Sequence, residues 1–276
     1  MSYYANPQIP ESLSSANEKQ LRSFGLTVLQ TLAALAAVLI VLELAARFLA
    51  PLTPFSWERR LAPDYFTRPA PAGSREAAIE AGLKTLSERL AAALEMPPDY
   101  ELTIHYRDDP LVNALAGFGG HIIIFRGLLE KMESEDALAA VLAHEMAHVR
   151  HRDPVKGLVR LVGLTLTLAL AGSGAASDLG QALAGVSLLS YSRRQETAAD
   201  AAATLALGRL YGHSQGFEDC FRILSRAAEG LPQAPEILSS HPDTLKRLRA
   251  SRDLAAGSGF PSRGRVTGLP APLSLP

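Results

Sequence analysis

His144-Glu145-Met146-Ala147-His148 is the stretch of this 276-residue sequence that decides which fold and chemistry it predicts. On a helix, residues four positions apart lie on the same face, so His144 and His148 would present two imidazoles side by side. Two neutral imidazoles in this arrangement can bind one Zn²⁺ ion, and Glu145 lies close enough to act as a general base toward a water molecule. The stretch therefore predicts a catalytic site with one zinc ion per chain.

The residues before this stretch predict the helix that such a site needs. Ser134 is a suitable N-cap residue, because its hydroxyl can accept a hydrogen bond from a free backbone N–H of the first turn. Glu135 and Asp136 follow where the helix dipole favours negative charge. Apolar residues then recur with the helical period at Leu138, Val141 and Leu142. We therefore expect both histidines on a helix with a buried face.

A catalytic zinc ion usually has three protein ligands and an open fourth position, so a third ligand is expected elsewhere. Glu196 is the best candidate, since it leads into the helix-forming run 201–207. Asp200 falls one turn later on the same face and can hydrogen-bond the second nitrogen of a zinc-bound imidazole. Two alternatives stay open. Glu196 pairs with a neighbouring arginine on a solvated face, or His151 is the ligand, although it lies off the face of the other histidines.

With these residues identified, the sequence resembles metallopeptidase family forty-eight, a gluzincin group that contains HtpX and the CAAX prenyl endopeptidases. The resemblance extends over about residues 109–249, and the family's elements occur in order: Asn113-Ala114, Gly119-Gly120-His121-Ile122-Ile123-Ile124, Gly127-Leu128-Leu129, Ser134 to Asp136, His144 to His148, Glu196 to Asp200, then His241-Pro242 with Arg247. The chain departs from the family at Gly117-Phe118, where many relatives carry a proline.

The resemblance implies a mostly helical, zincin-like enzyme that hydrolyses peptide bonds. It implies that His144, His148 and Glu196 bind the zinc ion. It also assigns Glu145 as the catalytic base and Asp200 as the residue that orients a ligand.

A glycine pair precedes a candidate substrate-binding strand. Gly119 and Gly120 signal a turn, and the β-branched run that begins with His121 and Ile122 predicts a short strand up to Phe125. If this strand lies at a sheet edge beside the metal, these residues would bind an extended substrate by strand addition. An ordinary buried strand is the alternative.

His241 is a second catalytic candidate. Pro242 disfavours helix at the preceding residue, which places His241 in a loop. The resemblance suggests that His241 or its neighbours stabilise the oxyanion, and the alternative is a simply exposed histidine. Arg247 is expected to anchor this loop through a carboxylate.

An apolar segment near the N-terminus predicts a membrane anchor. Residues 1–22 form a polar tail that we expect to be disordered, and residues 23–50 are apolar and long enough to span a bilayer. A secretory signal peptide is the competing interpretation, but the polar stretch before it is long and no small-x-small cleavage site follows. We therefore expect a single-pass protein of the cell membrane. Basic residues on both sides of the segment leave its orientation open.

The rest of the chain predicts one catalytic domain over residues 74–255. A linker is expected at 51–73 and a flexible, Gly- and Pro-rich tail at 256–276. Within the domain, patterns predict helices over 74–95 and 214–229 and a strand over 100–106. The fold class is therefore α+β, with a small sheet. The apolar region 161–191, which Gly172-Ser173-Gly174 and Asp178 interrupt, is expected to form a helical hairpin on the domain or at the bilayer surface, and a transmembrane pair is the alternative.

Charge and cysteine content exclude some classes of function. The net charge of −1 provides no basic surface for nucleic acid, and the single Cys220 excludes an internal disulfide framework. Expected partners are a protein or peptide substrate and the lipid bilayer. The predicted function is thus a membrane-anchored zinc endopeptidase in membrane or envelope protein quality control. A noncatalytic chaperone or scaffold with the same fold is the alternative.

Overall fold

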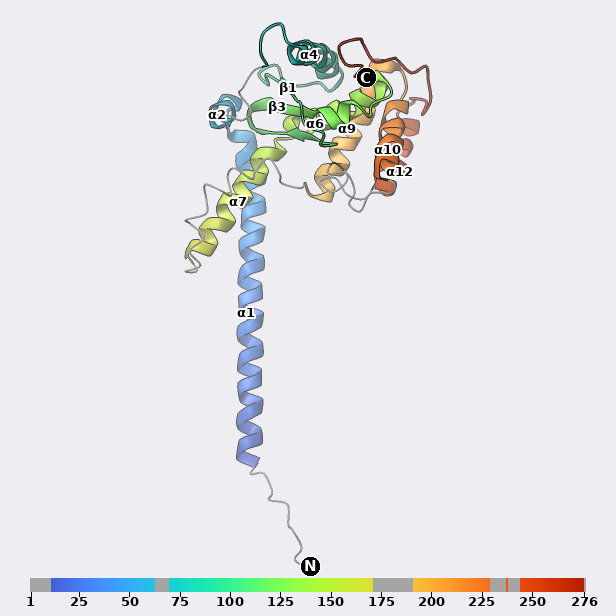
Figure 1. The fold of residues 1–276 in the computed structure, drawn as a ribbon. Coiled ribbons are helices and arrows are strands. Elements are labelled where there is room, and N and C mark those ends of the chain that lie inside the picture. The colour runs from blue at the N-terminus through green and yellow to red at the C-terminus, as the bar shows by residue number, and fades with distance from the viewer. Residues whose placement is uncertain (1–10, 63–69, 171–190, 229–236, 238–243, 276) are drawn as a thin grey trace, which may run out of the picture.

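The computed structural model describes residues 11–62, 70–170, 191–228, 237 and 244–275. One long helix, α1 (Glu11–Leu49), leads into a mostly helical domain that contains a three-stranded sheet. Helix α1 projects away from the domain, whereas the C-terminus lies on the domain (Figure 1). The expected class, a mostly helical α+β domain preceded by an apolar helix, is confirmed.

Helix α1 has the properties of a membrane-spanning segment. Gln20–Leu52 is the only described stretch that is long and apolar enough to cross a membrane, and no part of its most apolar window is buried inside the protein. A core helix of a soluble domain would be buried instead. The expectation of disorder is wrong for residues 11–22, which belong to α1. Pro10 precedes this helix and no glycine or proline follows until Gly25, so nothing in the polar segment breaks the helix.

The segment after α1, expected to be a linker, is partly folded onto the domain. It contains the short helices η1 (Ala50–Leu52) and α2 (Phe55–Leu61). The ring of Phe55 is buried and stacks on Tyr100 at a centroid distance of 4.4 Å. The buried carboxylate of Glu58 forms an ion pair with Arg152 at 2.6 Å. Apolar burial and this ion pair explain why α2 is held in place. Residues 63–69 of the expected linker lie outside the described residues.

The sheet has the order β1-β3-β2, so β3 is its central strand. Strand β3 (His121–Phe125) runs parallel to β1 (Thr103–Arg107) and antiparallel to β2 (Ala114–Ala116). The strand predicted over 100–106 therefore starts later, at Thr103. Of the two alternatives for the strand after Gly120, the structure has the ordinary buried strand and not the edge strand, because both edges of β3 are paired and all five residues are buried. The edge strand on that side is β2.

The glycine pair before β3 makes a tight turn beneath α2. Gly119 and Gly120, in the short helix η2 (Phe118–Gly120), have φ angles of 66° and 79°, in the region that favours glycine. A Cβ atom at Gly119 would lie 2.6 Å from the Arg59 Cα atom, and one at Gly120 would lie 2.4 Å from the Glu101 carbonyl oxygen. The pair therefore allows close backbone contact within the domain, which leaves no room for a substrate strand there.

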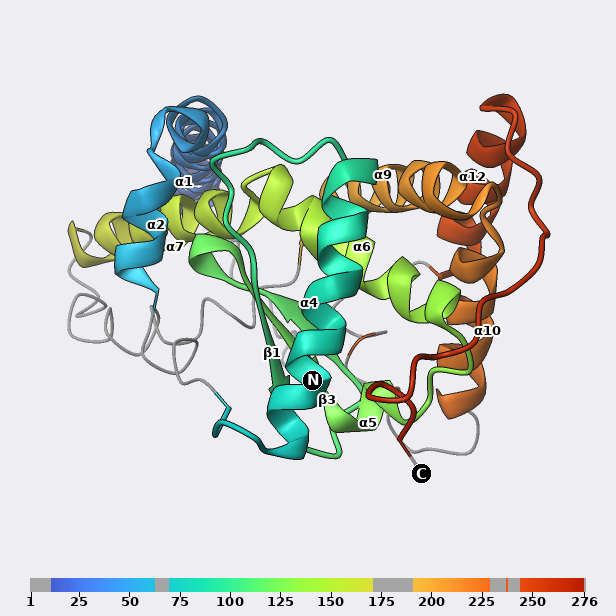
Figure 2. The ribbon, with the colours of Figure 1, turned by 90° about the horizontal axis from the view of Figure 1, so that it is seen from above.

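Three helices of the domain begin at serine caps. Ser74, Ser134 and Ser192 each accept a backbone N–H at the start of α4 (Arg75–Ala93), α6 (Glu135–Arg150) and α9 (Arg193–Tyr211). The predicted helix over 74–95 and the Ser134 cap are thus confirmed. Helix α4 crosses over β1 and α6, and α6 packs against α9 on its other side (Figure 2). Every residue of α6 from Glu135 to Val149 is buried, so this helix is the centre of the core.

The remaining helices extend from this centre. Helix α5 (Arg126–Leu129) follows β3, α10 (Gln215–Ala228) packs on α6, and α12 (Thr244–Gly257) packs on α9. Helix α10 matches the predicted helix over 214–229. Helix α7 (Asp153–Leu170) starts shortly after α6, packs against the C-terminal part of α1 and leads away from it toward its own end (Figure 1). The part of the expected hairpin over 171–190 lies outside the described residues.

The C-terminal segment 258–275 is bound to the domain, so the expectation of a flexible tail is wrong. Thr267 donates its N–H to Asp136 Oδ2 at 2.8 Å, and its carbonyl accepts the N–H of Glu135 at 2.9 Å. Leu273 is fully buried, with its side chain 3.1 Å from the Cβ position of Gly82 on α4. These contacts at the start of α6 and on α4 offset the conformational entropy that ordering the segment costs.

Candidate metal centre and active site

Helices α6 and α9 bring the predicted ligands together. The Nε2 atoms of His144 and His148 lie 3.1 Å apart, and each lies 3.5 Å from a carboxylate oxygen of Glu196. All three ligand atoms fall within 4.8 Å of one another, and all three side chains are buried. Among the described residues, this is the group that could hold a metal ion. Helix α6 supplies the histidines one turn apart, and the first turn of α9 supplies Glu196.

A carboxylate orients each imidazole. The Nδ1 atom of His144 lies 2.9 Å from Asp200 Oδ1, and the Nδ1 atom of His148 lies 2.9 Å from Asp153 Oδ2. An Nδ1–H that donates to a carboxylate leaves the Nε2 lone pair available as a ligand. Both rings are therefore held with their ligand nitrogens directed toward Glu196.

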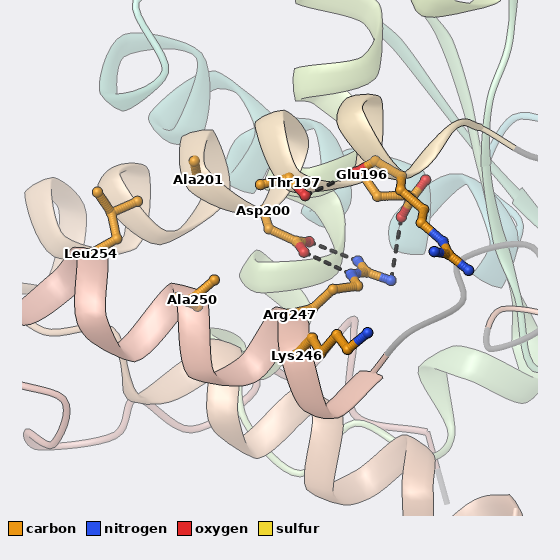
Figure 3. Close-up of a pocket in the computed structure, with 10 residues that line it drawn as sticks. Glu196, Thr197, Asp200, Ala201, Lys246, Arg247, Ala250 and Leu254 are labelled. Atoms are coloured by element: carbon orange, nitrogen blue, oxygen red, sulfur yellow. Dashed lines mark hydrogen bonds and ion pairs between the residues drawn. The ribbon is translucent and has the colours of Figure 1, made fainter.

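Arg247 of α12 supports the carboxylates from behind. Its guanidinium donates to both oxygens of Asp200, at 2.6 and 2.7 Å, and lies 3.3 Å from Glu196 Oε2 (Figure 3). A planar guanidinium fits a carboxylate with two parallel hydrogen bonds, which fixes the position of Asp200. We expected Arg247 to bind a carboxylate, and Asp200 is that carboxylate. The loop that Arg247 was expected to anchor, with His241, lies outside the described residues.

The electrostatics of the cluster favour positive charge. Burial alone would lower the pKa of His144, but hydrogen bonds to Asp200 and Glu196 outweigh it and raise this pKa to about 9. Burial would raise the pKa of Asp200, yet its hydrogen bonds with Arg247 and His144 hold that pKa below its usual value. Asp153 behaves in the same way, because its hydrogen bond with His148 outweighs burial. The cluster is thus a buried position in which a cation is stabilised.

The donor set fits a zinc ion. Two imidazole nitrogens and one carboxylate oxygen are the ligand types of catalytic zinc sites, which leave a fourth position open. Each imidazole has the carboxylate partner that zinc-bound histidines usually have. Sites for softer metal ions use cysteine thiolates as ligands, and the single cysteine, Cys220, is not part of the cluster.

A small apolar pocket opens beside the metal centre. Its volume is about 40 Å³, and both His144 and Glu145 line it. Its walls come from α6 and from α10, which contributes Phe217, Phe221 and Leu224, and they include Ile237. Glu145 itself is 1% exposed. The candidate base therefore faces an apolar cavity that is next to a candidate metal ligand.

Tyr191 links the metal centre to the sheet. Its ring stacks on His148 with 3.9 Å between centroids, and its hydroxyl donates a 3.2 Å hydrogen bond to the carbonyl of Ala116 on β2. Burial, followed by the charges of Glu145, Asp153 and Glu196, raises the pKa of Tyr191, so the hydroxyl keeps its proton. The free edge of the sheet consequently lies next to the ligand histidines.

Two residues of this site were missed in the sequence. Asp153 follows His148 by five positions, and the end of α6 lies between them, so helical periodicity gives no sign of their contact. Tyr191 stands just before the Ser192 cap of α9, where the only signal was an aromatic residue in an apolar run. The alternative ligand His151 is the C-cap residue of α6 and is not part of the ligand cluster.

Comparison with known proteins agrees with this geometry. Residues 77–255 match the profile of Peptidase family M48. The matched region contains the predicted ligands, the candidate base and both orienting carboxylates. It excludes α1, α2 and the C-terminal segment bound to α6.

Named relatives are similar over about half of the chain. The mitochondrial metalloendopeptidase OMA1 of Schizosaccharomyces pombe is 31% identical over 154 residues, which cover 55% of this chain and 46% of that protein. The beta-barrel assembly-enhancing proteases of Yersinia pestis and Escherichia coli are each 29% identical, over 63% and 52% of this chain and 38% and 32% of theirs. The chain thus spans less than half the length of these relatives.

Proposed function

Because the chain belongs to Peptidase family M48, we propose that it is a zinc-dependent endopeptidase that α1 holds in the cell membrane in a single pass. The observation that carries this proposal is the buried cluster of His144, His148 and Glu196 with Glu145 beside it. A purely structural zinc site is closed by a fourth protein ligand and needs no base. The arrangement therefore favours catalysis over the noncatalytic scaffold.

One zinc ion per chain would be held by His144 Nε2, His148 Nε2 and a Glu196 oxygen. When bound, zinc lowers the pKa of a water molecule to about 7 and polarises the scissile carbonyl. Asp200 and Asp153 keep the two imidazoles in the tautomer that binds a metal. Arg247 keeps Asp200 ionised and in place.

Glu145 is the proposed general base. It accepts a proton from the attacking water and passes it to the amine that leaves when the peptide bond breaks. Its place in a largely apolar pocket strengthens electrostatic interactions with the reacting groups, because little water is present to screen them. The oxyanion that forms on the scissile carbonyl needs a donor, and we keep His241 as the candidate for this role.

The strand that the substrate main chain pairs with is proposed to be β2, and not β3 as the sequence suggested. Gly117 N–H bonds the His121 carbonyl and Phe125 N–H bonds the Asn113 carbonyl. In an antiparallel ladder the residues that bond the partner strand alternate, so Ala114 and Ala116 direct their backbone groups to the outer edge, where the Ala114 N–H bonds Asn113 Oδ1 and the Ala116 carbonyl accepts from Tyr191. This edge can bind an extended peptide by strand addition, with one side chain in the apolar pocket.

The proposed substrates are proteins of the membrane or envelope, in quality control. An apolar anchor and an apolar pocket support this choice, as do two relatives, one a mitochondrial metalloendopeptidase and the other a beta-barrel assembly-enhancing protease. Neither the acidic net charge nor the site supports binding of nucleic acid.

Zinc content and casein cleavage of the purified protein, with and without a chelator, test this function. The proposal predicts one zinc per chain, loss of cleavage on chelation and recovery when zinc is added back. Glu145→Gln keeps the shape of the side chain but cannot take up the proton, so it should retain zinc and lose cleavage. Cleavage that persists in Glu145→Gln would refute the mechanism, and zinc binding without any cleavage by the unaltered protein would favour the scaffold.

A further inference from the structure

Helices α1 and α7 lie side by side where the anchor meets the domain (Figure 1). Arg160 of α7 donates to both carboxylate oxygens of Glu43 on α1, at 2.6 and 3.1 Å. Nearby, Gly163 lets the helices approach closely, because a Cβ atom there would lie 2.0 Å from a methyl carbon of Leu42. These contacts fix α7 against the part of α1 that is expected to lie in the bilayer.

A cleft of about 390 Å³ opens between the two helices. Its walls are apolar, with Leu39 and Leu42 from α1 and Leu161 and Leu164 from α7. Leu39 and Leu42 lie seven to ten residues before the end of α1 at Leu49, which corresponds to about 10–15 Å along a helix. The cleft is therefore placed near the boundary between hydrocarbon and water, on the side of the catalytic domain.

Tyr191 connects this cleft with the metal centre. Tyr191 lines the cleft, and the same ring stacks on His148 while its hydroxyl bonds the Ala116 carbonyl at the free edge of β2. The charged residues of the cleft, Glu43 and Arg160, also lie near the metal centre. Arg160 lies 3.5 Å from the side chain of Gln195, the residue before Glu196.

The two cavities next to the site lie on different sides of the domain. The apolar pocket beside His144 and Glu145 is lined by residues of α6 and α10. The cleft is walled by α7, which continues from the end of α6, and by α1. Figure 2 shows α10 on one side of the domain and α1 with α7 on the other. A peptide bound along β2 would have one flank in the pocket and the other directed into the cleft.

We propose that the cleft between α1 and α7 binds the apolar flank of a membrane-inserted protein substrate, so that cleavage occurs where the substrate leaves the bilayer. This rests on the proposed peptidase function. The apolar walls of the cleft suit a substrate segment that extends out of the lipid bilayer. The Glu43–Arg160 pair supplies charged groups close to where a substrate chain leaves helical structure and exposes polar backbone. Continuity with the catalytic centre through Tyr191 selects a polypeptide as the occupant over a lipid chain.

The test uses the full-length protein in phosphatidylcholine–phosphatidylglycerol vesicles with two substrates. One is a soluble peptide that the unaltered protein cleaves, and the other is the same peptide joined to a transmembrane helix. Leu164→Trp places a large side chain in the cleft. Leu166→Trp is the matched control, because Leu166 is on the same helix, 52% exposed and not part of the lining.

Leu164→Trp should lower kcat/KM for the tethered substrate by about ten-fold or more, the equivalent of about 1.4 kcal/mol of lost binding in the transition state. It should leave cleavage of the soluble peptide within about two-fold, and Leu166→Trp should change neither. Equal effects of the two variants, or an equal loss with both substrates, would overturn the proposal. If the unaltered protein cleaves neither substrate when zinc is bound, the proposed function itself fails.

Photo-cross-linking provides an independent readout. A photoreactive amino acid in place of Leu161 should form an adduct with the tethered substrate in the Glu145→Gln protein, which binds without cleaving. An adduct only with lipid, or only with residues 171–190 of the same chain, would assign the cleft to that occupant and contradict the proposal.

Discussion

His148 Nδ1 lies 2.9 Å from Asp153 Oδ2, and both side chains are almost completely buried. Asp153 is the first residue of α7, the helix that packs against the membrane anchor. Asp153→Ala should therefore weaken zinc binding by about 10- to 100-fold, the usual cost of losing a partner that orients a ligand. Competition with a chromophoric chelator measures this affinity. Lys156→Ala is the control, since Lys156 only contacts the other oxygen of Asp153, and equal affinities of the two variants would contradict the assigned role.

The Tyr191 hydroxyl donates a hydrogen bond to the Ala116 carbonyl, which the proposed substrate strand would also need as an acceptor. Tyr191→Phe keeps the ring on His148 but removes the hydrogen bond to Ala116. If the hydroxyl competes with substrate, the variant should lower KM by about 2- to 10-fold, the worth of one hydrogen bond, with little change in kcat. Steady-state kinetics with a soluble peptide separates the two constants. A kcat lowered about 100-fold or more would instead assign the hydroxyl to the stabilisation of the oxyanion.

His105 and His121 form a buried pair in the sheet, with His105 Nε2 at 2.9 Å from His121 Nδ1. Burial and the neighbouring His121 lower the pKa of His105 from 6.5 to about 4. The unfolded chain takes up this proton near pH 6.5 and the folded chain only near pH 4, so stability should fall as the pH falls through that window.

His105→Gln cannot take up the proton and should flatten this dependence by up to about 1.4 kcal/mol per pH unit. Urea unfolding of the metal-free protein between pH 4 and 7 measures the slope. Parallel curves for the variant and the unaltered protein would show that His105 does not titrate in this window.

The C-terminal segment should contribute to the stability of the catalytic helix. Leu273→Ala removes a fully buried side chain and should lower the free energy of unfolding by about 2–5 kcal/mol. Val266→Ala, in the same segment but 37% exposed, should change it by less than about 0.5 kcal/mol. Thermal unfolding of both variants tests the difference. If both melt like the unaltered protein, the segment does not stabilise the domain.

Local signals in the sequence were sufficient for the helices of the site. Ser134 and the periodic apolar residues predicted α6, and the acidic pair Glu196 and Asp200 one turn apart fell on α9 as expected. Within a helix, contacts follow from spacing. The relation between the two helices followed only from the chemistry of zinc, which requires a third ligand.

Contacts between distant segments were not predictable in this way. Phe55 stacks on Tyr100, and Thr267 bonds Glu135 and Asp136. Nothing in the sequence near Phe55 or Thr267 indicates these contacts with distant residues. The order of the sheet was missed for the same reason. The run from His121 to Phe125 predicts a strand, but only its partners determine whether it is central.

X-ray absorption at the zinc edge reports which atoms bind the metal and so tests the assigned ligands. We expect one zinc per chain with only nitrogen and oxygen neighbours, at about 2.0–2.2 Å, and a sharp loss of zinc in Glu196→Ala. A sulfur neighbour at about 2.3 Å, or full zinc occupancy in Glu196→Ala, would contradict the assigned ligands.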